Sequence, residues 1–264
     1  MCYLPQYLEK EIRNKVELIR DSKSRSLSLF CQKRNKRAIE KNAQIHSFRI
    51  ENPKIIVPYS VPKNKRCIKK GIKNISGAFR WGKQNFNPEK FNESFIRNIA
   101  GKICPNVWEG GIADYRRVTY GVTISGSEFT PSYPQKVVDI EIPFFENSLR
   151  EKLTSCNEDP IKQILAAAYA HFHIARIHPF EDCNGRTART TQDIILDHYG
   201  LPAPVIEAGE RDIYYKCLEA AVDDWKDKEG IKAAENATKG EGMFYSFIAG
   251  KVNVSLDKVL DCIR

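Results

Sequence analysis

The stretch His178–Arg189 reads HPFEDCNGRTAR and decides how the whole chain is interpreted. It lies between two expected helices, and Asn184-Gly185 opens the second of them. The first N–H groups of a helix have no partners within the helix, so they attract anions and phosphates above all. Glycine at position 185 allows the backbone to approach a ligand closely. The stretch therefore predicts an anion-binding site.

Side chains of the same stretch add to this site. Arg186 and Arg189 are three residues apart and reach the same side of the helix, where two guanidinium groups suit a polyphosphate. Asp182 is placed to anchor Mg²⁺, whose remaining ligands are water and phosphate oxygen. A neutral imidazole at His178 takes a proton from an attacking hydroxyl. Each residue alone is more often structural, but together they indicate nucleotide chemistry with His178 as the base.

The composition describes a globular chain of 264 residues, 42% apolar and 28% charged, which suits one medium domain with an appended element. No apolar run is long enough to span a membrane, and the N-terminal sequence lacks the pattern of a secretory signal. We therefore expect a cytoplasmic protein without a membrane partner. The net charge of +9 fits solvated basic surface or an acidic partner. Nucleic acid is disfavoured, because we find no recognition helix, zinc finger or RNA-binding aromatic motif.

The eight cysteines are scattered, with no pair or cluster at zinc spacing. An even number also permits disulfides. We expect free thiols in a reducing compartment, since the disulfide argument applies to short secreted chains.

Apolar spacing predicts a mostly helical chain. Asp159 caps the strongest helix and Pro160 suits its first turn. Alternation at Val118, Tyr120, Val122 and Ile124 predicts a strand, and residues 128–138 return as a second strand in a hairpin. The remaining helices are expected over residues 5–20, 33–50, 91–103, 185–199, 211–226 and 243–262. Residues 53–90 look irregular because prolines interrupt them.

HPFEDCNGRTAR resembles the Fic-domain motif HxFx(D/E)GNGRxxR. The match holds at His178, Phe180, Asp182, Asn184, Gly185, Arg186 and Arg189. Residues from Gly111 to Pro134 resemble the target-recognition flap of that family, and Gly200-Leu201-Pro202 with Arg211 and Tyr214 resembles its downstream helices. The likeness covers roughly residues 90–225.

This resemblance implies a protein adenylyltransferase that moves AMP from ATP to a Ser, Thr or Tyr hydroxyl of a target protein. His178 would deprotonate the hydroxyl, Asp182 would hold Mg²⁺ or Mn²⁺, and Phe180 would pin the loop to the core. The flap at Ile124, Ser125, Gly126 and Ser127 would hold the target through its backbone. ATP would be bound by Asp182, Cys183, Asn184, Gly185, Arg186, Thr187, Ala188, Arg189 and Tyr214.

Cys183 stands where this motif usually has glycine. We interpret it as a tolerated small residue. Two alternatives stay open: a positive φ at a cost of about 1 kcal/mol, and a redox-sensitive thiol beside the phosphates.

Residues 47–52, SFRIEN, resemble the Fic inhibitory motif (S/T)xxxE(G/N) through Ser47, Glu51 and Asn52. The resemblance implies an ion pair between Glu51 and Arg189 that occupies the arginine meant for the γ-phosphate. The chain would then be inhibited by its own N-terminal helix.

We thus expect an all-α, Fic-type helical bundle with a β-hairpin flap and an N-terminal inhibitory helix. The expected divisions are an inhibitory helical region at 1–55, an irregular connector at 56–90, a Fic core at 91–226 and a helical segment at 227–264. Two alternative reactions stay open: hydrolysis of an AMP–protein bond with Glu51 as the base, and transfer from another nucleotide. The target and the oligomeric state, including a homodimer, are also open.

Overall fold

The computed structural model describes residues 4–22, 26–52, 65–108, 111–117, 130–226 and 238–261. Every regular element within these ranges is a helix, so the expected all-α class is confirmed for this part of the chain. The hairpin expected over 118–138 is not shown: residues 118–129, including Ile124–Ser127, lie outside the described ranges.

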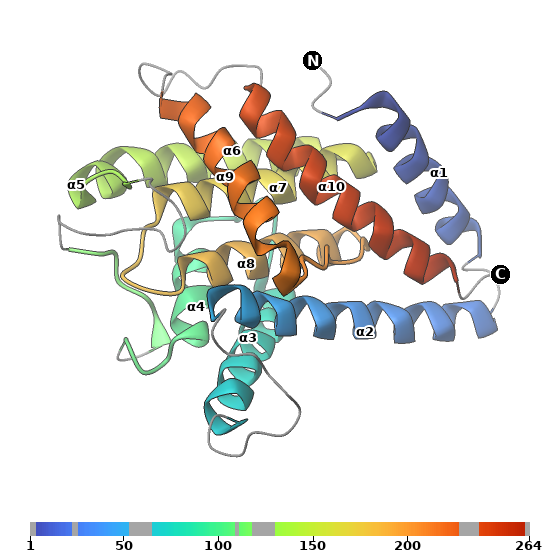
Figure 1. Ribbon diagram of the computed structural model, residues 1–264, viewed down its shortest axis with the longest axis horizontal. Coiled ribbons are helices and arrows are strands. Elements are labelled where there is room, and N and C mark those ends of the chain that lie inside the picture. The colour runs from blue at the N-terminus through green and yellow to red at the C-terminus, as the bar shows by residue number, and fades with distance from the viewer. Residues whose placement is uncertain are drawn as a thin grey trace.

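Two helices at the centre of the molecule position the stretch between them (Figure 1). They are α7 (Pro160–Ile177) and α8 (Asn184–His198), which pack against each other. The carboxylate of Asp159 accepts hydrogen bonds from the N–H groups of Ile161 and Lys162, so the predicted N-cap of α7 is confirmed. Almost every side chain of α7 is buried, because other helices cover all its sides.

The surrounding helices form the walls of this core. On one side, α8 is covered by α3 (Lys65–Asn85) and α4 (Glu93–Ile103), while α6 (Ile142–Ser155) lies on α7. The other side of α7 is covered by α10 (Lys239–Leu260), which packs against α9 (Arg211–Lys226).

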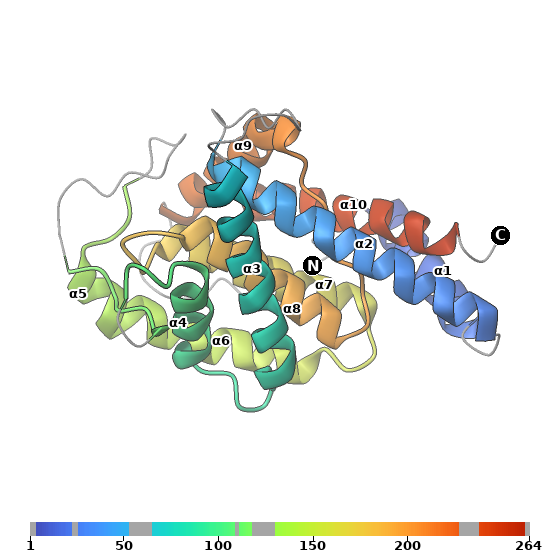
Figure 2. The same cartoon turned by 90° about the horizontal axis from the view of Figure 1, so that it is seen from below.

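The N-terminal helices complete the bundle. α1 (Gln6–Ser22) packs on α10, and the long α2 (Ser26–Glu51) contacts α8, α3 and α10 (Figures 1 and 2). Phe48 near the end of α2 sits directly on Gly71 of α3, where a Cβ atom would clash with the phenyl ring. This close approach fixes the end of α2 beside the start of α8.

Two expectations about secondary structure are wrong. Residues 65–85, expected as part of an irregular connector, form α3 because its apolar residues face α4 and α8. Residues 134–138, expected in a second strand, are helical. They belong to α5 (Pro134–Lys136) and to a π-helix (Val137–Glu141), which continue into α6. Pro134 suits the first turn of a helix, where its missing N–H costs nothing.

The described cysteines include both a disulfide-bonded residue and free thiols. Cys31 is disulfide-bonded, which contradicts the expectation of free thiols for this residue. Cys104, Cys156, Cys183 and Cys217 are free. Within the described ranges, no helix combines the length and apolar character that a membrane crossing requires.

Candidate active site

A pocket of about 170 Å³ lies where the end of α2, the start of α8 and α9 meet. One wall is the stretch singled out in the sequence, and Glu51 stands opposite it. The lining residues are Glu51, Ala175, His178, Glu181, Asp182, Cys183, Asn184, Gly185, Tyr214, Tyr215 and Leu218.

The loop between α7 and α8 is held by its backbone. His178 ends α7 in the left-handed conformation, with φ 49°, and its N–H donates to the carbonyl of Ile174 at 3.1 Å. Arg116 donates from Nε to the carbonyl of His178 at 2.8 Å and from its backbone N–H to the carbonyl of Pro179 at 2.9 Å. These bonds fix the imidazole at the pocket wall.

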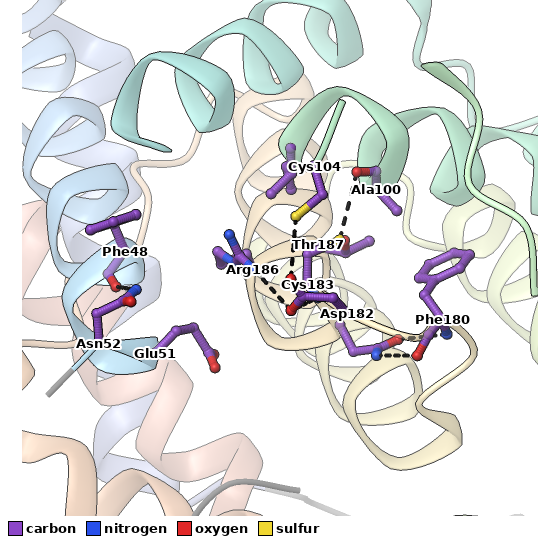
Figure 3. Close-up of polar contacts among 12 residues, drawn as sticks. Phe48, Glu51, Asn52, Ala100, Cys104, Phe180, Asp182, Cys183, Arg186 and Thr187 are labelled. Carbon is purple, nitrogen blue, oxygen red and sulfur yellow. Dashed lines mark hydrogen bonds and ion pairs between the residues drawn. The ribbon is translucent and has the colours of Figure 1, made fainter. Parts of the chain in front are cut away.

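Asn184 and Phe180 tie the same loop to the core. The Asn184 side chain accepts from the N–H of Phe180 at 2.9 Å and donates to its carbonyl at 2.7 Å (Figure 3). The Phe180 ring is fully buried, stacked on Tyr115 at 6.0 Å and edge-on to Trp108 at 6.1 Å. The Asn184 side chain therefore stabilises the conformation of the loop, while its backbone N–H lies in the first turn of α8.

Cys183 precedes α8 as its N-cap residue, with φ 63° and ψ 14°. Our interpretation of an ordinary small residue at this position is therefore wrong: the backbone requires a positive φ, which costs a cysteine about 1 kcal/mol. The first backbone bond of α8 runs from the N–H of Thr187 to the carbonyl of Cys183 at 2.8 Å. The N–H groups of Asn184, Gly185 and Arg186 form the first turn of α8 and have no acceptor within the helix, as at the start of any helix.

Arg186 and Asp182 lie at the mouth of the pocket. Arg186 donates to Oδ1 of Asp182 at 3.0 Å, and the Asp182 side chain is 60% exposed. The Nε of Arg186 is buried and has no hydrogen-bond partner among the described residues. A buried guanidinium N–H without an acceptor favours an anionic ligand at this position.

The expected ion pair between Glu51 and Arg189 is present, with 2.6 Å between Oε1 and Nη2. Arg189 also donates from Nε to the hydroxyl of Ser47 at 2.9 Å and from Nη2 to its carbonyl at 3.1 Å. Burial lowers the pKa of Arg189, but the Glu51 carboxylate together with Tyr214 and Tyr215 outweighs it, so the net shift of the pKa is upward. The carboxylate also covers Gly185, where a Cβ atom would clash with Oε1.

A buried chain of hydrogen bonds supports Arg189 from the other side. The Tyr214 hydroxyl accepts from Nη1 of Arg189 at 3.3 Å and lies 2.9 Å from Nε2 of His171. Nδ1 of His171 lies 2.8 Å from Oε1 of Gln192. Burial, followed by the charge of Arg189, lowers the pKa of His171 to about 3, so this imidazole is neutral.

His178 also has a neutral imidazole at pH 7. Burial lowers its pKa to about 4, and the positive charge of Arg116 acts in the same direction. A neutral imidazole with a free nitrogen can accept a proton.

The structure thus brings His178, Asp182, Cys183, Asn184, Gly185 and Tyr214 to one pocket, with Glu51 at its edge. Thr187 and Ala188 are fully buried in α8 and do not line it. Asn52 instead completes the end of α2, since its side chain donates to the carbonyl of Phe48 at 2.9 Å (Figure 3). Sequence reasoning missed Tyr215 and Leu218, which continue the face of α9 that carries Tyr214, and Cys104, for which no local signal exists.

Asp182 is the residue that the sequence predicts to hold a metal ion. No group of three or more His, Cys, Asp or Glu side chains in the described ranges is arranged to hold one. The exposed carboxylate of Asp182 fits Mg²⁺, which proteins commonly hold through one or two carboxylates together with substrate phosphates.

Residues 90–196 match the Fic/DOC family. Among related sequences, a protein adenylyltransferase fic-1 from Caenorhabditis briggsae is 34% identical over 94 residues, 36% of this chain and 18% of that protein. A protein adenylyltransferase Fic from Nematostella vectensis is 37% identical over 75 residues, 28% of this chain and 18% of that protein. The matches thus span less than a fifth of these relatives.

Solved structures share the fold over nearly the whole chain. A Fic-domain-containing signaling protein from Bacteroides thetaiotaomicron superposes with a TM-score of 0.73 at 21% identity, covering 96% of this chain and 97% of that one. A fragment of Fic-1 from Caenorhabditis elegans gives 0.69 at 18% identity, covering 96% and 72%. Residues 90–196 of the chain therefore match the Fic/DOC family, the described residues have a Fic-type helical fold, and part of the chain is distantly related to Fic protein adenylyltransferases.

Proposed function

We propose that this chain is a protein adenylyltransferase that transfers AMP from ATP to a Ser, Thr or Tyr hydroxyl of a target protein, and that Glu51 inhibits it in the resting state. The observation that carries the proposal is the convergence of a neutral His178, Asp182 and the start of α8 on one pocket, with Arg186 and Arg189 paired to the carboxylates of Asp182 and Glu51 that line it. The family match and the adenylyltransferase relatives support the same reaction.

The chemical step needs a base and an anion cradle. His178 takes the proton of the target hydroxyl, whose oxygen bonds to the α-phosphorus of ATP while the bond to the β-phosphate oxygen breaks. AMP stays on the target and pyrophosphate leaves. Phosphates bound beside His178 raise its pKa above the value in the free protein, because nearby negative charge favours the imidazolium.

The cradle consists of the first N–H groups of α8 together with Arg186, whose buried Nε has an unused donor. Asp182 would hold Mg²⁺ or Mn²⁺ on the phosphates. When bound, the metal would neutralise part of the negative charge of the phosphates. Tyr214 and Tyr215 form the α9 side of the pocket and suit the base of the nucleotide.

In this proposal Glu51 inhibits the transfer. Its carboxylate takes a donor of Arg189 that a γ-phosphate would need, and it covers Gly185 where the cradle must be open. A polyphosphate in the productive position would meet a negative charge at both points. Removal of Glu51 would therefore free the site.

The proposal also covers how the target protein is held and whether the chain forms a homodimer. Residues Ile124–Ser127 would hold the target through their backbone, and a homodimer remains compatible. The reverse reaction stays a second candidate because Glu51 lines the pocket together with His178, where a carboxylate can orient a water for hydrolysis of an AMP–protein bond.

The decisive experiment labels the full chain with ATP carrying a radioactive α-phosphate. Glu51→Gly should raise auto-modification above wild type, and His178→Ala should abolish it in either background. Glu158→Gly, at an exposed turn, is the matched control and should label like wild type. Equal labelling of Glu51→Gly and wild type would remove Glu51 as the brake, and labelling of His178→Ala would remove His178 as the base.

Two further arms separate the reactions. Competition by unlabelled ATP, GTP, UTP and CTP identifies the nucleotide. Time-dependent release of AMP from a purified modified protein by the wild-type chain, with no release by Glu51→Gly, would favour the hydrolase.

A further inference from the structure

Two cysteine side chains meet beside the pocket, between the end of α4 and the start of α8 (Figure 3). Cys104 is the C-cap residue of α4, and its N–H donates to the carbonyl of Ala100 at 3.0 Å. The thiol of Cys183 approaches the same carbonyl at 3.6 Å. Both cysteines thus contact the carbonyl of Ala100, and Figure 3 shows their side chains next to each other. Residues 79 positions apart in sequence are therefore adjacent in space.

The pair is set directly against the residues that bind phosphate and metal in the proposed function. Sγ of Cys104 lies 3.8 Å from Oδ2 of Asp182, and the N–H of Cys183 donates to Oδ1 of the same carboxylate at 2.5 Å. Cys183 also lines the pocket.

The backbone at position 183 favours glycine, because its φ is positive. The side chain of Cys183 is buried in the core and makes no capping hydrogen bond to α8. Its thiol contacts are long, 3.6 Å to Ala100 and 3.6 Å to Thr187. Unlike another small side chain, it also brings a second sulfur next to Cys104.

We propose that Cys104 and Cys183 are an oxidisable thiol pair that hydroperoxides convert into a disulfide at the edge of the pocket. The sulfur of one cysteine attacks a peroxide oxygen, the O–O bond breaks, and one water leaves with a sulfenic acid on that sulfur. The second thiol attacks this sulfur and displaces the hydroxyl as another water. Two thiols and one hydrogen peroxide thus give one disulfide and two waters.

The disulfide joins the C-terminus of α4 to the N-terminus of α8. Its formation draws the two sulfurs to about 2.05 Å, and it removes the thiol contact of Cys104 with Asp182 and the contact of Cys183 with Ala100. If the proposed function is correct, oxidation weakens nucleotide binding, since outer contacts of a metal ligand commonly change affinity by about tenfold or more.

The test treats the full chain with hydrogen peroxide, alkylates remaining thiols after denaturation and maps the peptides by mass spectrometry. The expected product is a cross-linked peptide pair containing Cys104 and Cys183, lighter by the mass of two hydrogen atoms and reversed by dithiothreitol. Cys104→Ser and Cys183→Gly should each abolish it, glycine being the variant that suits the backbone at 183. Cys156→Ser, at another buried free cysteine, is the matched control and should retain it.

Recovery of both cysteines as alkylated thiols, or as sulfinic acids without a link, would overturn the proposal. A second arm measures binding of a fluorescent ATP analogue to the reduced and oxidised chains, with about a tenfold loss expected on oxidation. If the link forms and affinity is unchanged, its effect on the pocket is refuted. If neither form binds nucleotide, the proposed function fails while the thiol pair stands on its own.

Discussion

Asp193 is a carboxyl group that the fold keeps away from water. It lies on α8, is 7% exposed, and its Oδ1 accepts from Nε2 of Gln192 at 3.3 Å. Burial raises its pKa to about 8, although Gln192 and the charge of Arg189 lower it. At pH 7 this side chain is therefore a neutral acid in the folded protein and a carboxylate in the unfolded chain.

This difference destabilises the protein as the pH rises. Between pH 4 and pH 8 the folded state holds a proton that the unfolded state has released, so the free energy of unfolding falls with pH. One pKa unit corresponds to about 1.4 kcal/mol, and pH 7 lies about three units above the unfolded value. Asp193→Asn keeps the shape and removes the titration, so at pH 7 it should stabilise the protein by about 4 kcal/mol.

The measurement is urea unfolding of Asp193→Asn and wild type at pH 5, 6, 7 and 8. The difference between the two proteins should widen by about 1.4 kcal/mol per pH unit up to pH 8, because all other groups titrate equally in both. Asp212→Asn, at an exposed position of α9, should show no such trend. A difference that stays constant across this range would refute the assignment of a buried neutral acid.

Three further predictions concern the core and the loop. His171 is neutral when folded and takes up a proton on unfolding below pH 6.5, so wild type should lose about 2 kcal/mol more than His171→Gln between pH 7 and pH 5; parallel urea curves would contradict this. Phe180→Ala should lower the free energy of unfolding by about 4 kcal/mol, and a loss below about 1 kcal/mol would show that the ring is not an anchor. Asp159→Ala should cost about 1 kcal/mol in thermal unfolding, whereas Asp159→Asn, which can still cap, should cost less.

Local signals made much of the helical structure predictable. Asp159 followed by Pro160 marked the start of α7, and the expected helix over 91–103 corresponds to α4. α3 could have been found as well, since Ile68, Ile72, Ile75 and Phe79 follow helical spacing. The prolines that favoured an irregular connector lie on either side of this helix and not within it.

The rest depends on contacts between distant residues. The π-helix at 137–141 places Glu141 against Arg176, with 3.3 Å between Oε1 and Nη1. No local sequence pattern predicts this buried ion pair. The loop residues were predictable because they are contiguous, and Glu51 because it belongs to a recognisable motif. Cys104 has no such signal, and Arg116 belongs to the stretch that resembles the flap, which does not predict its bond to the carbonyl of His178.

The length of α2 gives the pocket a mechanical property. A helix of 26 residues is a rod of about 39 Å, and Glu51 is its last residue. A tilt of about 3° about the midpoint of such a rod moves its tip by about 1 Å. That displacement stretches the 2.6 Å bond between Glu51 and Arg189 to the limit of a hydrogen bond. The ion pair between Glu51 and Arg189 therefore depends on α2 keeping its direction, which its packing on α3, α8 and α10 maintains.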